Sequence, residues 1–152
     1  MRVTAVASAR EETGFLGART LAQSLGCDIA IVVDVIFASD DPGASPKRAG
    51  GRVLLGGGPV IARGTASAAH LVELVDEVSE ASGIPCQPRA ASGPAGTDAD
   101  DMLTARDCAV LSVSIPLRYM HSALEVASAA DLESCVRLLV EILRALETPD
   151  AR

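Results

Sequence analysis

Acidic and imidazole side chains follow the apolar segments of this sequence at several points. Glu11 and Glu12 come after an apolar run at the amino terminus, Asp34 ends a second run, Asp98 follows a third run and its loop, and His121 follows a fourth. Ligands of open α/β sheets collect outside the carboxyl ends of the strands, so these side chains are expected on one rim. Zinc accepts carboxylate oxygens and imidazole nitrogens at about 2.0 to 2.2 Å. The rim is therefore a candidate site for a divalent metal.

The same residues also have purely structural interpretations. Asp34 lies in the apolar run Ile31–Phe37, where an unpaired buried charge is costly, so a functional role is favoured for it. Glu11 and Glu12, taken alone, are typical of solvated loop acids. His121, taken alone, is equally consistent with a hydrogen-bonded structural histidine.

Other motifs indicate structure rather than chemistry. His70 directly precedes Leu71 on a predicted helix and is expected on the surface of that helix. The triplet Gly56–Gly58 lacks the Lys and Ser/Thr of a phosphate-binding loop and is expected to form a turn. The sequence has no G-x-S-x-G pattern, which disfavours a serine hydrolase. The acidic rim remains the candidate site.

The elements that must position these residues alternate between strand and helix. Strands are predicted at residues 2–8, 28–35, 86–90 and 108–115, with shorter ones at 52–55 and 59–62, and helices at 14–25, 67–82, 98–107 and 128–146. Pro116 is expected to stop the strand before it. The buried stripe of the last helix is expected to comprise Leu132, Val136, Leu139, Leu143 and Leu146. This alternation predicts an α/β domain layered around a mostly parallel sheet.

Composition and charge exclude several classes of function. The chain has 152 residues, the size of one domain, and its 49% hydrophobic and 22% charged residues are typical of folded soluble proteins. A net charge of -7 repels phosphate backbones and an aromatic content of 2% leaves no base-stacking platform, so nucleic acid is not an expected partner. The apolar runs are far shorter than the roughly 18 residues of a membrane span, so no membrane association is expected.

Cysteine usage and the amino terminus indicate the compartment. The four cysteines Cys27, Cys86, Cys108 and Cys135 lie 59, 22 and 27 positions apart, without a C-x-x-C pair. This pattern favours free, buried thiols in a reducing cytoplasm. The apolar stretch at the amino terminus is shorter than that of a signal peptide and is interrupted by polar residues. A cytoplasmic protein is therefore expected.

Five short motifs stand in the order found in one enzyme family. They are Glu11 to Ala18 (EETGFLGA), Asp34-Val35, Gly58 to Ile61 (GPVI), Gly96 to Ala99 (GTDA) and Arg118 to Ser122 (RYMHS). With spacings of 22 residues from Glu12 to Asp34 and 87 from Asp34 to His121, the chain resembles the binuclear metallo-aminopeptidases. That family comprises glutamyl, deblocking and tetrahedral (TET) aminopeptidases, some of them labelled endoglucanase M. The resemblance covers nearly all of the chain and implies a zinc-peptidase-like α/β/α fold.

The resemblance also implies a division of labour at the metal site. Glu11 would be the general base, which takes a proton from a metal-activated water and returns it to the leaving amine. Glu12 and His121 would hold one metal ion and Asp34 the other. The family carries two ions, and zinc and cobalt both match these ligands.

Four more residues would surround the substrate, by the same resemblance. Thr97 and Asp98 would line the substrate side of the site or support the ligands from behind. Arg118 and Tyr119 would shape the same rim. Peptides with free amino termini would be the substrates. A homo-oligomer, or an upstream segment, would cover the first predicted strand, because the chain begins inside that strand.

The sequence departs from the family pattern at its amino-terminal end. In the family, a histidine and an aspartate that bridges both metals precede the matched region, as does a small inserted domain used in assembly. Residues 1–152 therefore resemble an N-terminally truncated, C-terminal portion of the catalytic domain, without a separate second domain. His70 cannot replace the upstream histidine, because it lies on a helix of a different segment.

Three functions follow from these observations. The expected function is a metal-dependent aminopeptidase that lacks two upstream ligands. The alternative is a catalytically inactive fragment that acts only as a folded or oligomerising subunit. Glycoside hydrolysis is disfavoured, because the adjacent Glu11 and Glu12 do not suit the separation of about 5 to 9.5 Å between the two carboxyl groups of glycosidases.

Overall fold

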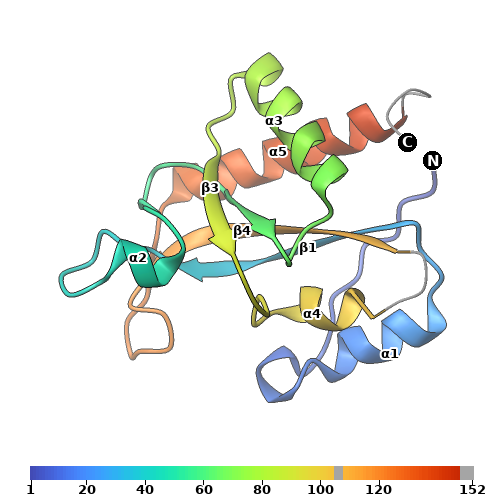
Figure 1. The fold of residues 1–152 in the computed structure, drawn as a ribbon, viewed down its shortest axis with the longest axis horizontal. Coiled ribbons are helices and arrows are strands. Elements are labelled where there is room, and N and C mark those ends of the chain that lie inside the picture. Colours follow the sequence, from blue (N-terminus) through green and yellow to red (C-terminus); the bar gives the residue numbers. More distant parts are fainter. Residues whose placement is uncertain (105–107, 148–152) are drawn as a thin grey trace.

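A mixed, mostly parallel sheet lies between two layers of helices in the computed structural model, which describes residues 1–104 and 108–147 (Figure 1). The strand order is β1-β4-β2-β3, and the short strand β5 pairs with β4. The strands are β1 (Ile29–Phe37), β2 (Val60–Gly64), β3 (Gln87–Ala91), β4 (Ala109–Arg118) and β5 (Val126–Ala127). The layered α/β class predicted from the sequence is confirmed.

Two parallel strand pairs make up the sheet. β1 and β4 pair in register from Ile29 opposite Ala109 to Phe37 opposite Leu117. β2 and β3 form the second parallel pair. The two pairs meet where β2 runs antiparallel to β4, so β3 ends at the opposite edge of the sheet from β1 and β4. The expectation that all strands end on one rim is therefore wrong for β3, although Asp98, which follows it, still lies close enough to Glu11 and Asp34 to affect their charge.

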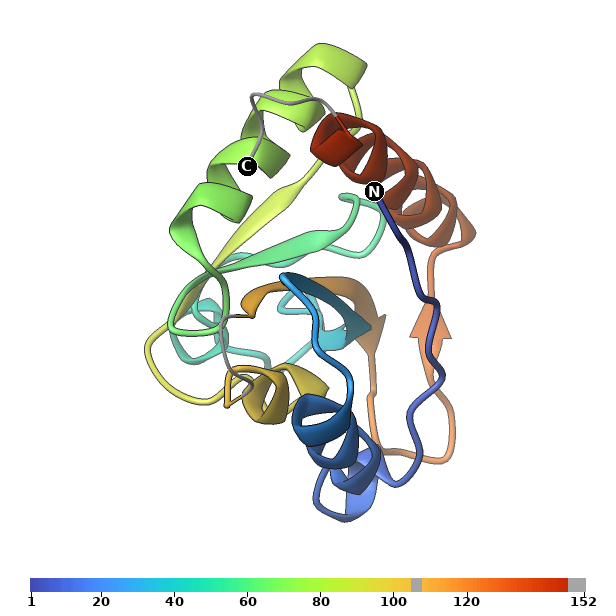
Figure 2. The same cartoon turned by 90° about the vertical axis from the view of Figure 1, so that its right-hand side faces the viewer.

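Two helices cover each face of the sheet (Figure 2). On one face, α3 (Ala69–Ser82) and α5 (Ala129–Glu147) enclose a core that includes Leu71, Leu111 and Leu138. On the other face, α1 (Leu16–Ser24) and α4 (Asp98–Met102) pack around Ala18, Ala99, Met102 and Val110. The remaining helices are the 3-10 turn η1 (Glu11–Thr13) and the short α2 (Pro46–Ala49). None of the helices in the described ranges is long and apolar enough to cross a bilayer.

The amino-terminal segment is not the buried strand predicted at residues 2–8. Those residues are exposed and pair with no strand of the sheet, although they alternate β-prone residues. The segment instead bonds to helix ends: Gly17 N–H donates to Ala9 O at 2.9 Å, and the Ser8 hydroxyl donates to Asp98. These contacts hold it beside α1 and α4 rather than along the edge of β1.

Helix α5 is rotated by about one residue from the stripe predicted for it. Leu132 and Val136 are 53% and 55% exposed, so the predicted stripe is wrong at both positions. The buried side chains are Asp131, Cys135, Leu138, Ile142 and Leu146. The rotation has a polar cause, because the carboxylate of Asp131 accepts the backbone N–H groups of Gly56 and Gly58, each at 2.7 Å. These two bonds turn the face that carries Asp131 toward the sheet.

Several element boundaries also differ from the prediction. β4 does not stop before Pro116 but continues to Arg118. The proline is tolerated because it lies beyond the β2 pairing, which ends at Ser114, and before the β5 pairing, which starts at Leu117. Residues 52–55 form no strand, and α4 ends at Met102. The predicted continuation of that helix through residues 105–107 lies outside the described residues.

Candidate active site

Two predicted metal ligands lie in contact although 109 positions separate them in the chain. Glu12 Oε1 is 3.4 Å from His121 Nε2, and their side chains are 74% and 61% exposed. Glu12 belongs to η1, and His121 lies in the turn after β4. The imidazole also meets the ring of Phe37 edge-on, with centroids 6.1 Å apart. The pair is thus oriented by β1 and β4 and remains accessible from solvent.

The backbone around this pair adopts conformations that non-glycine residues rarely take. Among the described residues, the non-glycine positions with positive φ are Arg10 (62°), Phe15 (53°), Tyr119 (60°) and His121 (64°). Two of these flank η1, and two lie in the turn that carries the imidazole. Backbone strain of this kind concentrates at functional sites, because only the surrounding structure maintains it.

Glu11 and Asp34 lie in an acidic environment that raises the pKa of both. Burial raises the pKa of Glu11 most, and the charges of Asp34, Glu12 and Asp98 raise it further, while His121 lowers it. Burial also raises the pKa of Asp34, against the Val35 N–H that donates to its Oδ1 at 2.7 Å. The carboxylates of Glu11, Asp34, Glu12 and Asp98 therefore lie close enough to affect one another's charge.

Asp34 and Asp98 reach the acidic group by routes that differ from the prediction. Asp34 lies within β1 rather than at its end, because the strand continues for three more residues to Phe37. Asp98 arrives from the first turn of α4. Its Oδ2 accepts the Ser8 hydroxyl, and its Oδ1 is buried with no partner among the described residues. The side chain therefore adds negative potential to the site without being neutralised there.

Thr97 is a helix cap. Its hydroxyl oxygen accepts the Ala99 N–H at 3.2 Å, and the residue is 5% exposed. This bond satisfies one of the free N–H groups at the start of α4. Thr97 thus fixes the first turn that carries Asp98, and its own hydroxyl is occupied by the helix.

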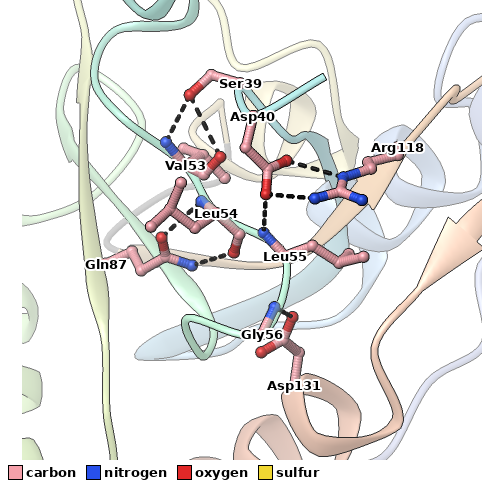
Figure 3. A network of polar contacts seen from close by, with 9 residues as sticks. All are labelled: Ser39, Asp40, Val53, Leu54, Leu55, Gly56, Gln87, Arg118 and Asp131. Atoms are coloured by element: carbon pink, nitrogen blue, oxygen red, sulfur yellow. Dashed lines mark hydrogen bonds and ion pairs between the residues drawn. The ribbon is translucent and has the colours of Figure 1, made fainter. Parts of the chain in front are cut away.

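Arg118 is held by an ion pair with Asp40. Its Nε and NH2 groups donate to the two Asp40 oxygens at 3.0 and 2.7 Å (Figure 3). Asp40 also accepts the Leu55 N–H at 3.2 Å, and the Arg118 guanidinium lowers the pKa of that carboxyl. Arg118 therefore ties the end of β4 to the segment after β1. Tyr119, the next residue, is 45% exposed at the rim.

Along residues 53–56, side chains rather than a neighbouring strand form hydrogen bonds with the backbone. The sequence did not predict these side-chain partners. Val53 N–H donates to Ser39 Oγ at 2.8 Å, and Leu54 exchanges hydrogen bonds with the Gln87 amide at 2.8 and 2.9 Å (Figure 3). Asp131 accepts from Gly56, as described above. Asp131 follows Ser128 at the spacing of a capping box, whereas no sequence pattern distinguishes Gln87 from a surface residue.

The donor chemistry at Glu12 and His121 fits one divalent ion in part. A carboxylate and an imidazole in contact are suitable zinc ligands. Within residues 1–104 and 108–147, however, no three His, Cys, Asp or Glu side chains are close enough to hold an ion together. The ligand set is therefore incomplete in this part of the chain.

Comparison with known sequences shows similarity to a family of aminopeptidases. The profile of the M42 glutamyl aminopeptidase family matches residues 1–138. A lysyl aminopeptidase of Pyrococcus furiosus is 37% identical over 148 residues, which are 95% of this chain and 41% of that protein. The chain thus spans about two fifths of the length of this curated relative.

Solved structures give the same result. A TET aminopeptidase of a marine sediment thaumarchaeote is 32% identical, with a TM-score of 0.84 over 95% of this chain and 41% of that one. A TET peptidase of Pyrococcus horikoshii that can assemble into a tetrahedron or a large octahedral shell is 31% identical. Its TM-score is 0.69 over 87% of this chain and 37% of that one.

Proposed function

The chain belongs to the M42 glutamyl aminopeptidase family, and we propose on this basis that it contributes to metal-dependent removal of amino-terminal residues from peptides. The observation that carries the proposal is the Glu12–His121 contact at 3.4 Å, with the carboxylate of Glu11 next to it in η1. This arrangement combines two ligand atoms with a neighbouring carboxylate that is free to move a proton.

We assign the metal ligands as the family resemblance implies. Glu12 and His121 hold one divalent ion and Asp34 the other, with zinc or cobalt as the ions. Two more ligands, a histidine and a bridging aspartate, are expected from outside the described residues, which agrees with the incomplete ligand set found there. We accordingly regard residues 1–152 as the C-terminal portion of the catalytic unit.

Glu11 is the proposed general base. A divalent ion, when bound, polarises the scissile carbonyl and acidifies a water molecule. The carboxylate of Glu11 would accept a proton from that water at one of its oxygens and would later donate it to the leaving amine. Burial, and then the charges of the neighbouring carboxylates, raise the pKa of Glu11 toward the range where a base works at neutral pH.

A chromogenic aminopeptidase assay tests the proposal. The purified chain is assayed on aminoacyl anilides after addition of zinc or cobalt, beside Glu11→Gln and the control Glu73→Gln on α3. Metal-dependent turnover that Glu11→Gln abolishes and Glu73→Gln preserves supports the assignment. Turnover that survives in Glu11→Gln rejects Glu11 as the base, and no turnover at any metal concentration rejects activity of this chain alone.

A second function is favoured by an exposed apolar face. Leu132, Val136 and Val140 project from α5 with exposures of 53%, 55% and 41%. Such a face suits a protein that acts as an oligomerising subunit without catalysis. Light scattering over a range of concentrations distinguishes this function: self-association that is independent of metal, together with absent turnover, favours the subunit.

A further inference from the structure

Two cysteine thiols lie against each other at the end of the sheet remote from the candidate active site. Cys27 Sγ and Cys108 Sγ are 2.9 Å apart, closer than unbonded sulfur atoms ordinarily pack. Cys27 lies two residues before β1, and Cys108 directly precedes β4. We propose that these two thiols form a reversible intramolecular disulfide by reaction with a low-molecular-weight disulfide.

The backbone already brings the two residues to bridging distance. Ala109 N–H donates to Asp28 O at 2.8 Å, which continues the β1–β4 ladder beyond Ile29. By this register Cys108 lies opposite Asp28, the residue after Cys27, and neighbouring strands about 4.8 Å apart keep such an offset pair within the range of Cα separations that disulfides span. The bridge therefore requires rotation of side chains rather than movement of strands.

The surroundings allow a small oxidant to approach while keeping the pair together. Both residues are partly buried and pack at the margin of the core beneath α1 and α4. Burial and the neighbouring Cys27 raise the pKa of Cys108 to about 12. Cys108 is thus protonated at neutral pH and is not the thiol that starts the exchange.

The thiol–disulfide exchange takes place in two steps. The Cys27 sulfur, as thiolate, attacks one sulfur of the small disulfide, which forms a mixed disulfide and releases one small thiolate. The Cys108 sulfur then attacks Cys27 Sγ, the protein disulfide forms and the second small thiolate leaves. The two protons lost by the cysteines end on the two released thiols. The cysteine pair is oxidised by two electrons, and the small disulfide is reduced by two.

The bridge would act on the strand pair that carries the candidate site. β1 carries Asp34, and β4 leads into the turn of His121. A disulfide at the amino ends of both strands closes a loop across 81 sequence positions. A loop of this length reduces the entropy of the unfolded chain, so the oxidised form should melt about 5 to 10 °C above the reduced form.

Thiol counting by mass spectrometry tests the proposal. The reduced chain is incubated with oxidised glutathione at pH 8.5 until its mass is constant, then denatured and alkylated with N-ethylmaleimide. Four adducts are expected before oxidation and two after it, with Cys27 linked to Cys108 in the peptide map. Cys86→Ser, the control, should still lose two thiols, whereas Cys27→Ser should form no internal bridge.

Other results overturn the inference. Four adducts after exhaustive incubation would show that the thiols do not bridge. A disulfide that includes Cys86 or Cys135, or one that joins two chains, would show that the contact between Cys27 and Cys108 does not determine which thiols bridge. The peptide map of the wild-type protein shows by itself whether Cys27 and Cys108 are linked, so failure of a variant to fold does not affect the conclusion.

Discussion

The carboxylate of Asp131 accepts the backbone N–H of Gly58 at 2.7 Å and joins the first turn of α5 to the glycine turn before β2. Its other oxygen accepts Gly56 N–H at the same distance, and the residue is only 1% exposed. A buried charge with two backbone donors is stable only while both bonds persist. The position of α5 on the sheet therefore depends on a polar contact.

Replacement of Asp131 should destabilise the fold. Asp131→Ala leaves the two glycine N–H groups without their acceptor, and we expect the free energy of unfolding to fall by about 3 kcal/mol. Urea unfolding followed by circular dichroism measures the change. Glu133→Gln, on an exposed position of the same helix, should change it by less than about 0.5 kcal/mol. Equal effects of the two variants would contradict the role assigned to Asp131.

Gly17→Ala should displace the segment that leads to Glu11. A Cβ at Gly17 would lie 2.5 Å from Ala9 N and 2.7 Å from Ala9 O, and because both are backbone atoms the segment that contains Ala9 must shift. We expect a loss of about 1 to 3 kcal/mol in stability and faster tryptic cleavage after Arg10. Gly26→Ala is the matched control, because an added Cβ there meets nothing within 4 Å. Unchanged cleavage in Gly17→Ala would refute the coupling.

Acid should weaken the tie between β4 and the segment after β1. Arg118 lowers the pKa of Asp40 in the folded protein, so the unfolded chain binds a proton there at higher pH. This contribution is fully present above the unfolded pKa and is lost as the pH falls through the lowered folded pKa. In Asp40→Asn the melting temperature should drop by a few degrees at pH 7. Below about pH 4 it should also depend less on pH than the melting temperature of the wild type does. Thermal melts between pH 2.5 and 7 check this. If the melting temperature of Asp40→Asn depends on pH in the same way as that of the wild type, the Asp40–Arg118 pair is not the source of this dependence.

Removal of the His121 imidazole should weaken zinc binding. His121→Ala deletes one of the two side chains in contact at the site, so the affinity for zinc should fall by about tenfold or more. Competition with a chromophoric chelator gives the affinity without any need for turnover. His70→Ala removes the other histidine of the chain, an exposed side chain on α3, and should leave the affinity unchanged. Equal losses in both variants would indicate adventitious binding.

Residue type and spacing predicted that Glu12 and His121 lie near each other, but not the contacts that hold the surrounding segments in place. Glu11, Glu12, Asp34 and His121 were found because chemically reactive side chains follow apolar segments, and the structure brings Glu12 and His121 into contact. The alternation of elements likewise predicted the layers. That order carries no strand direction, so the antiparallel step between β2 and β4 could not be foreseen.

The errors arose where polar contacts outweighed hydrophobic periodicity. The stripe through Leu132 and Val136 has the correct helical period, but the two hydrogen bonds of Asp131 turn a different face inward. Residues 52–55 were predicted to form a strand, but their backbone groups bond mostly to side chains, such as those of Gln87 and Asp40, rather than to a second strand. Contacts between side chains and distant backbone leave no periodic trace in the sequence.

Because β1 lies at the edge of the sheet, Asp34 has a second effect. Within the described residues, β1 pairs along one side only, and its sequence IAIVVDVIF is apolar apart from this carboxylate. Open strands of this composition are templates for cross-β stacking between chains. A charge in the middle of such a strand acts as a gatekeeper, since stacked copies would bring like charges together. The carboxylate assigned to metal binding therefore also protects the free chain from aggregation.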